Sequence, residues 1–264
     1  MQVVAHRGSS AAHAEHTLAA YELAIEEGAD ALECDIRLTR DGVLVCVHDR
    51  KVDRTSDGRG VVSTLELADL AELDFASWKG SQGDRLLEAD WETLDRDRTQ
   101  VLTLERLLQL TLDHERSAEL HIETKHPTRY GGLVERALIE LLERYGAARP
   151  MSRSVSRVKV MSFAPTSLRR VHAMAPALPT VLLMDRVPVR FRDGSLPPRV
   201  TIAGPSLEIV KAHPGYVDRA QAAGHRVHVW TVDEPEDIAD VLALGVDAVI
   251  SNHPRRVLRA LGRV

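Results

Sequence analysis

The sequence predicts an α/β fold, a (β/α)8 TIM barrel with a small insertion after the second strand. Short β-branched runs alternate with longer stretches of helical periodicity, which is typical of parallel βα units. Eight such runs occur along the chain. A chain of 264 residues with 44% hydrophobic content is also long enough to bury one barrel core, for which about 250 residues are usual.

The expected elements follow one another along the whole chain. The strands are expected at residues 3–5, 31–38, 119–124, 157–161, 180–184, 200–203, 226–232 and 247–250. The helices are expected at 17–27, 104–112, 133–145, 166–173, 207–223 and 236–244. His213-Pro214-Gly215 should interrupt the helix that contains it. The turn at 39–42 predicts a hairpin that returns the chain along the second strand.

Residues from about 50 to 103 depart from the repeat, since they contain no strong strand. Ser63 and Glu66 have the spacing of a capping box, which predicts that a short helix starts there. We interpret this stretch as an insertion within a single domain that covers residues 1–264. Loops that leave the carboxyl ends of barrel strands build the active site, so the insertion is expected above the barrel mouth.

Composition narrows the class of protein. A formal net charge of -5 and a pI near 6.2 provide no overall basic field to gather nucleic acid. The sequence has no run of about 18 apolar residues and no signal peptide, so no transmembrane segment is expected. Cys34 and Cys46 are the only cysteines, which argues against a disulfide scaffold and suits a reducing compartment. We expect a cytoplasmic protein that acts on a small molecule, with its oligomeric state open.

Carboxylates gather on the second and third strands. Side chains alternate along a strand, so Glu33 and Asp35 point to the same side of an otherwise buried strand. Two unpaired charges there would be very costly, and a divalent cation such as Mg²⁺ or Ca²⁺ is the simplest compensation. In the next strand Glu123 and Lys125 share a side, which offers a third carboxylate and the local positive charge that a phosphodiester oxygen needs.

Two histidines are expected near these carboxylates. His6 ends the first strand, and the hairpin brings His48 back toward Glu33. A single buried histidine is more often structural. Here, however, one neutral imidazole could take a proton from an attacking hydroxyl, while a protonated imidazole donates a proton to the leaving alkoxide. The pattern therefore indicates metal-assisted hydrolysis. Three aspartates are interpreted as turn and surface groups and are left out of the metal site: Asp41, Asp49 and Asp53.

Trp230 shares one face of its strand with His228. At a barrel mouth its ring could pack against the apolar part of a ligand, and plain core filling is the other interpretation.

Six short motifs occur in order along almost the whole chain: His6-Arg7-Gly8, Glu15-His16-Thr17, Glu33-Cys34-Asp35, His48-Asp49, Glu123-Thr124-Lys125 and Val229-Trp230-Thr231-Val232. Together they resemble the glycerophosphodiester phosphodiesterase family. The resemblance implies a (β/α)8 barrel that splits a glycerophosphodiester into sn-glycerol 3-phosphate and an alcohol. It also implies roles for the residues: His6 and His48 as acid and base, Glu33, Asp35 and Glu123 as ligands of one Mg²⁺ or Ca²⁺, and Arg7 and Lys125 as phosphate contacts.

The chain departs from the family pattern at His16, Asp233 and Asn252, where the family commonly has Asn, Asn and Asp. These changes bear on substrate fit and are the only support for a phosphate-binding barrel without catalysis. A second alternative is a lysophospholipase D, for which an apolar surface on the insertion would be the relevant feature. That surface would involve Phe75, Trp78 and Trp91.

Overall fold

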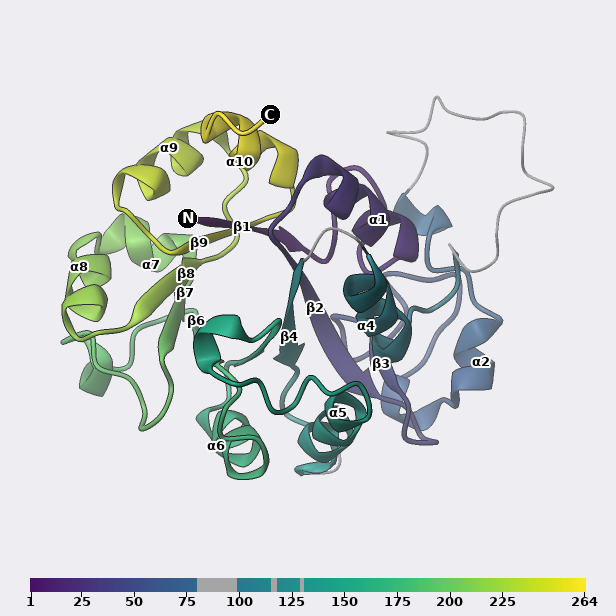
Figure 1. Cartoon of the computed structure of the whole chain (residues 1–264). Coiled ribbons are helices and arrows are strands. Elements are labelled where there is room, and N and C mark those ends of the chain that lie inside the picture. Colours follow the sequence, from purple (N-terminus) through teal and green to yellow (C-terminus); the bar gives the residue numbers. More distant parts are fainter. Residues whose placement is uncertain (80–98, 115–117, 129–130) are drawn as a thin grey trace.

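Residues 1–79, 99–114, 118–128 and 131–264 are described by the computed structural model. Eight parallel strands form a closed barrel with helices on its outside (Figure 1). β1 pairs with β2 on one side and with β9 on the other, which closes the ring. The predicted TIM barrel is confirmed.

The strands agree closely with the sequence pattern. The parallel strands are β1 (Gln2–His6), β2 (Ala31–Leu38), β4 (Glu119–Thr124), β5 (Val158–Ser162), β6 (Thr180–Met184), β7 (Ile202–Pro205), β8 (Arg226–Val229) and β9 (Ala248–Ser251). The observed ends lie within one residue of expectation, except in β7 and β8. The strand expected from residue 200 begins at Ile202, because the Val200 N–H bonds the Pro197 carbonyl in a turn. The strand expected to reach 232 ends at Val229, and only an isolated bridge joins Trp230 to Ser206.

The expected hairpin is present. β3 (Leu44–Cys46) runs antiparallel to β2 and places Cys46 opposite Ile36. Because β3 returns along β2, the chain that follows it comes back to the level of Asp35, whose carbonyl accepts the Val47 N–H at 3.0 Å. Cys34 and Cys46 are both buried and free.

Helices fill the connections between strands. They are α1 (Leu18–Glu27), α2 (Leu67–Ala71), α4 (Leu104–Asp113), α5 (Leu133–Arg144), α6 (Pro165–Met174), α7 (Leu207–Ala212), α8 (Gly215–Ala222), α9 (Pro235–Ala243) and α10 (Pro254–Ala260). The break predicted at residues 213–215 separates α7 from α8. Local chemistry sets the ends of α1: the Thr17 hydroxyl accepts the Ala20 N–H, and Gly28 ends the helix at φ 96°, a conformation that favours glycine.

The described part of the insertion has a small core of its own, which includes Val52, Val62, Leu70 and Phe75. The predicted capping box is wrong. Ser63 lies in a 3-10 turn, and Glu66 is itself the N-cap of α2, paired with Asp69. Phe75 is buried, so it does not belong to an exposed apolar surface, whereas Trp78 is 37% exposed. Residues 80–98 of the predicted insertion, with Trp91, lie outside the described residues.

An apolar layer fills the barrel interior. Val4, Met161, Leu183 and Ile250 come from four strands and form one buried cluster. Two larger clusters pack the outer faces of the strands against the helices. Each fully buried aliphatic side chain contributes roughly 1.5–3 kcal/mol, so these clusters hold the barrel rigid and fix the strand ends.

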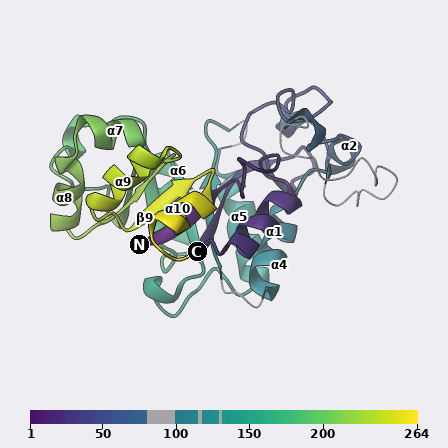
Figure 2. The same cartoon turned by 90° about the horizontal axis from the view of Figure 1, so that it is seen from above.

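The two termini lie side by side at one end of the barrel (Figures 1 and 2). The Arg263 guanidinium, just beyond α10, donates to both carboxylate oxygens of Asp30 at 2.6 and 2.7 Å. Within the described ranges, no helix combines the length and the apolar character that crossing a bilayer requires.

Candidate active site

Three buried carboxylates meet at the carboxyl ends of β2 and β4. The register places Asp35 opposite Glu123, and Glu33 lies on the same side of β2. Ligand oxygens of these three residues all lie within 4.8 Å of one another. Glu33, Asp35 and Glu123 are 3%, 1% and 7% exposed, so water screens their charges little.

The surroundings of the three acids shift their pKa values in opposite directions. Burial first, and then the charge of Asp35, raise the pKa of Glu33 well above its usual range and that of Glu123 to about 8. Burial also opposes ionisation of Asp35. The hydrogen bond from His16 and the charges of Arg7 and Lys125 nevertheless hold its pKa well below its usual range. Asp35 is therefore the ionised centre of the cluster.

Basic groups surround that centre. Arg7 Nε lies 3.0 Å from one Asp35 oxygen, and Lys125 Nζ lies 3.2 Å from the other. Lys125 Nζ is also 2.8 Å from Glu123 Oε1, so it bridges two of the three carboxylates. His16 Nε2 lies 3.0 Å from Asp35 and its Nδ1 2.8 Å from the Tyr21 hydroxyl. Arg7 and His16 have φ angles of 58° and 62°, a strain of the kind found at functional sites.

His6 faces the cluster from the end of β1. Its Nε2 lies 3.9 Å from Glu33 Oε2, and its Nδ1 lies 2.7 Å from the Asn252 side-chain oxygen. The Asn252 amide nitrogen donates to Asp233 at 2.6 Å, and a carboxylate can only accept this bond, so the amide oxygen must face His6. A neutral His6 ring therefore carries its proton on Nδ1, and its unprotonated Nε2 faces the carboxylates. Burial first, and then Arg7, lower the pKa of His6 to about 4.

His48 follows the hairpin, as predicted. Its Nδ1 lies 2.7 Å from Asp49 Oδ1, and the other Asp49 oxygen accepts from Arg54 at 2.7 Å. Arg54 in turn donates to both oxygens of Glu15. Burial lowers the pKa of His48, while the charge of Asp35 acts against that shift. The hairpin thus brings this ring into the electrostatic field of the carboxylates.

Several groups that hold the site were not expected from the sequence. Asp49, interpreted as a turn and surface group, also bonds His48 Nδ1, a contact that was not expected; its position next to a histidine was the available signal. Asp233 and Asn252 depart from the family pattern separately in the sequence, yet they are hydrogen-bonded partners here. No local pattern connects Asn252 with His6, because the barrel closes between its first and last strands.

Trp230 lies just beyond the end of β8. Its indole N–H donates to the Gly204 carbonyl at 2.7 Å, and its ring packs on the interior apolar layer. Phe163, which is 41% exposed, stands edge-on to it with ring centroids 5.3 Å apart. The tryptophan thus fills the core with part of its surface, while the aromatic pair gives the site an apolar border.

The comparisons with known proteins agree with one another. The model of the "Glycerophosphoryl diester phosphodiesterase family" matches residues 6–256. A protein of Mycobacterium tuberculosis named "Probable glycerophosphodiester phosphodiesterase 1" is 49% identical over 96% of this chain and 90% of its own length. "Glycerophosphodiester phosphodiesterase" of Bacillus subtilis is 34% identical over 95% of this chain and 83% of its own.

A solved structure shares the whole fold. It is an Oleispira antarctica phosphodiesterase in complex with the product sn-glycerol-3-phosphate, and it superposes with a TM-score of 0.81 at 25% identity. The match covers 99% of this chain and 97% of the other.

Proposed function

Because the chain belongs to the glycerophosphoryl diester phosphodiesterase family and is a glycerophosphodiester phosphodiesterase, we propose how it acts. It hydrolyses glycerophosphodiesters to sn-glycerol 3-phosphate and an alcohol, with a divalent cation at Glu33, Asp35 and Glu123. His6 and His48 exchange the protons. The single observation that carries this proposal is the meeting of three buried carboxylates with basic groups and a histidine at one end of the barrel. We also propose that residues 1–264 work as one domain.

The residues fit a hard divalent cation. All three candidate ligands offer carboxylate oxygens, which suit Mg²⁺ or Ca²⁺ better than softer metals. Burial and the charge of Asp35 raise the pKa values of Glu33 and Glu123 despite the nearby Arg7 and Lys125, which supports a further positive charge at this site. A bound dication would supply the missing positive charge and polarise the phosphoryl oxygens of the substrate.

The two histidines divide the proton transfers. One neutral ring takes the proton of the attacking hydroxyl, which belongs either to water or to the glycerol 2-hydroxyl. The other ring, protonated, donates to the alkoxide as its bond to phosphorus breaks. Asn252 and Asp49 accept at Nδ1 of His6 and His48, so each ring can present Nε2 to the substrate. After direct attack by water, the rings regain their starting protonation through solvent. After attack by the glycerol 2-hydroxyl, water opens the cyclic phosphate with the roles of the two rings reversed, which gives sn-glycerol 3-phosphate and restores both rings.

The remaining site residues bind and orient the substrate in this proposal. Lys125 and Arg7 offer N–H donors and positive charge to the phosphate oxygens. Trp230, with its neighbour Phe163, offers an apolar wall to the carbon skeleton. A phosphodiester therefore has a charged side and an apolar side to lie against.

The test is a direct assay. Purified protein with Mg²⁺ or Ca²⁺ should release glycerol 3-phosphate from glycerophosphocholine or a related diester, and a chelator should abolish the release. His6→Ala and His48→Ala should each lower turnover at least ~100-fold. His213→Ala, which removes an exposed histidine between α7 and α8, is the matched control and should keep full turnover.

Three further measurements complete this test. A cyclic phosphate seen by ³¹P NMR would identify the glycerol hydroxyl as the attacking group. Turnover on lysophospholipids compared with fully deacylated diesters separates the lysophospholipase D alternative. The proposal fails if no glycerophosphodiester is hydrolysed with any divalent metal.

A further inference from the structure

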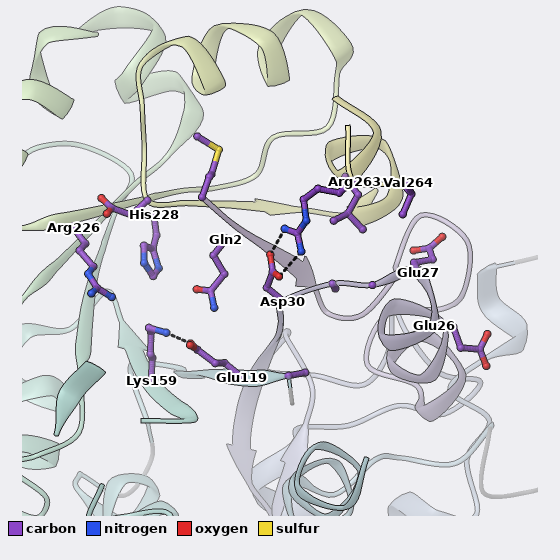
Figure 3. A pocket seen from close by; sticks show the side chains of 16 residues that line it. Gln2, Glu26, Glu27, Asp30, Glu119, Lys159, Arg226, His228, Arg263 and Val264 are labelled. Carbon is purple, nitrogen blue, oxygen red and sulfur yellow. Dashed lines mark hydrogen bonds and ion pairs between the residues drawn. The ribbon is translucent and has the colours of Figure 1, made fainter. Parts of the chain in front are cut away.

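A second polar cavity lies at the opposite end of the barrel, where the strands begin. Its volume is about 780 Å³, and its wall includes Gln2, Glu119, Lys159, Arg226 and His228 (Figure 3). Gln2, Glu119 and Arg226 are the first residues of β1, β4 and β8. We call this cavity the floor pocket. The carboxylates of the mouth lie at the other ends of the same strands.

Basic and imidazole groups line the inner wall of the floor pocket. Lys159 is 5% exposed and contacts the carboxylate of Glu119. His228, 2% exposed, stacks on buried His121 with ring centroids 5.5 Å apart and planes 13° from parallel. Nδ1 of each ring is buried and has no hydrogen-bond partner among the described residues. Such orphaned ring nitrogens are costly unless something fills the space beside them.

The inner wall of the floor pocket holds two cations, Lys159 and Arg226, beside one carboxylate, that of Glu119. Arg226 makes no ion pair with any residue in the described ranges. Burial first, and then repulsion by Arg226, lower the pKa of Lys159 to about 8. Burial, His121, Lys159 and Arg226 together lower the pKa of His228 well below its usual value. Glu119 is the one carboxylate that contacts this group among the described residues: it pairs with Lys159, and its Oε2 lies 3.5 Å from His121 Nε2.

Three of the four other acids on the wall accept hydrogen bonds, and the fourth, Glu26 on α1, is exposed. Asp30 accepts two bonds from Arg263, as the dashed lines in Figure 3 show. Asp247 accepts the Val227 N–H at 2.8 Å, and Glu27 accepts the Ser9 hydroxyl at 2.8 Å. Among the described residues, the acidic cluster able to hold a metal is at the mouth and not at the floor. On the inner wall, around Lys159, Arg226 and His228, the free binding capacity is therefore that of donors and positive charge.

We propose that the floor pocket binds a small oxyanion of the phosphate type, separately from the catalytic site. Lys159 has three N–H donors and uses one on Glu119, so it can turn others toward the anion. Arg226 would add a planar fork of donors from the pocket rim, and His228 a ring N–H. An anion placed between them would balance the second of the two cations that share the Glu119 carboxylate. The inference does not depend on the mechanism proposed at the mouth.

The experiment uses the two buried histidines as local reporters. Inorganic phosphate is titrated into the full-length protein while the His228 and His121 ring resonances are followed by NMR, with the His228 signal assigned through its loss in His228→Phe. The mouth also attracts phosphate, but both reporter rings lie at the floor. We expect a saturable shift of these ring signals at roughly millimolar phosphate. Sulfate should act alike, and chloride at matched ionic strength should not.

Variants then locate the site. Arg226→Gln changes an exposed side chain and should weaken the phosphate response about tenfold. Arg255→Gln on α10, also exposed, is the matched control, and Lys125→Gln alters only the mouth; both should keep the full response. Lys159→Met combined with Glu119→Gln removes the buried pair together and should abolish the response.

Each result has a clear meaning. A response that Arg226→Gln reduces and that Lys125→Gln preserves supports the floor pocket. Absence of any ring shift, an equal effect of chloride, or a response unchanged in Arg226→Gln would overturn the proposal. Since Arg226 is exposed and unpaired with any described residue, that variant gives the decisive comparison even if the buried double variant does not fold.

Discussion

The two ends of the barrel are built on the same strands and differ in the charged groups that face inward. β4 begins with Glu119 at the floor and brings Glu123 to the mouth. At the mouth, three carboxylates face Arg7 and Lys125, whereas at the floor one carboxylate faces Lys159 and Arg226. An apolar layer separates the two groups. The alternation of side chains along a strand thus permits polar groups inside both ends.

The same substitution at both ends of β4 gives the largest expected difference. Glu123→Gln removes a proposed metal ligand and should lower kcat/KM on the order of 100- to 1000-fold. Glu119→Gln, its matched control on the same strand, should leave kcat/KM within a few-fold of the wild type. Steady-state assays across a range of Mg²⁺ concentrations measure both variants. Equal losses in the two variants would show that β4 does not separate a catalytic end from a floor.

A second comparison concerns two buried glutamates near the mouth. Burial and Asp35 raise the pKa of Glu123 to about 8. Burial also acts to raise the pKa of Glu135, but hydrogen bonds from His126 and other partners, including Arg170, lower it to about 2. Glu135 Oε1 lies 3.1 Å from His126 Nε2 and 3.2 Å from Arg170 Nη1. Partners therefore decide whether a buried glutamate at this end is a reactive group or a structural ion.

Glu135→Gln should reveal this structural role through pH. Since the folded pKa is lowered, the carboxylate stabilises the fold above its unfolded pKa of about 4.5, and this contribution disappears as the pH falls through about 2. The variant should lose about 2 kcal/mol of unfolding free energy at pH 7, with a smaller loss at pH 3. Urea unfolding at both pH values measures it. Exposed Glu140→Gln on α5 is the control, and a pH-independent loss would contradict the assignment.

Features of this architecture that depend on neighbouring residues could be predicted from the sequence. Alternation predicted that Glu33 and Asp35 share a face, and the hairpin predicted the return of His48, because both features depend on a few neighbouring residues. The strand start predicted at Val200 was wrong, because the residue type alone does not distinguish an apolar residue in a turn from one in a strand. The capping box predicted at Ser63 was wrong for a similar reason, since the residue types of a helix cap also occur within a 3-10 turn.

Contacts across the barrel closure could not be predicted in this way. His6 and Asn252 lie on the first strand and just after the last, and only the pairing of β1 with β9 brings them together. The floor pocket has the same origin, because His121 and His228 stack from two separate strands. The pattern within one segment predicts which side of a strand a residue faces. Its neighbours on that side depend on how the barrel closes.

The hydrogen bond between Asn252 and His6 can be used to test how far the closure of the barrel affects the catalytic end. Asn252→Ala removes the acceptor that fixes the His6 ring and should lower kcat about tenfold or more, with KM little changed. The His6 ring nitrogen shifts in an NMR spectrum should also move, since the Nδ1–H form loses its partner. Ser10→Ala removes a hydroxyl that bonds the same amide oxygen at 2.8 Å and serves as the milder control. An unchanged kcat with unchanged ring shifts would show that Asn252 only fills space.

Asp49 gives the smallest expected effect and distinguishes two aspartates that look alike in the sequence. Asp49 accepts at His48 Nδ1 but is 33% exposed, so water can partly replace it. Asp53 only caps a turn by accepting the Gly60 N–H at 2.9 Å. Asp49→Asn should therefore lower kcat roughly five- to tenfold, less than Asn252→Ala, because the amide can still offer an oxygen to the ring. Asp53→Asn should leave kcat unchanged, and a loss of equal size in both variants would mean that the loop, not the His48 contact, controls turnover.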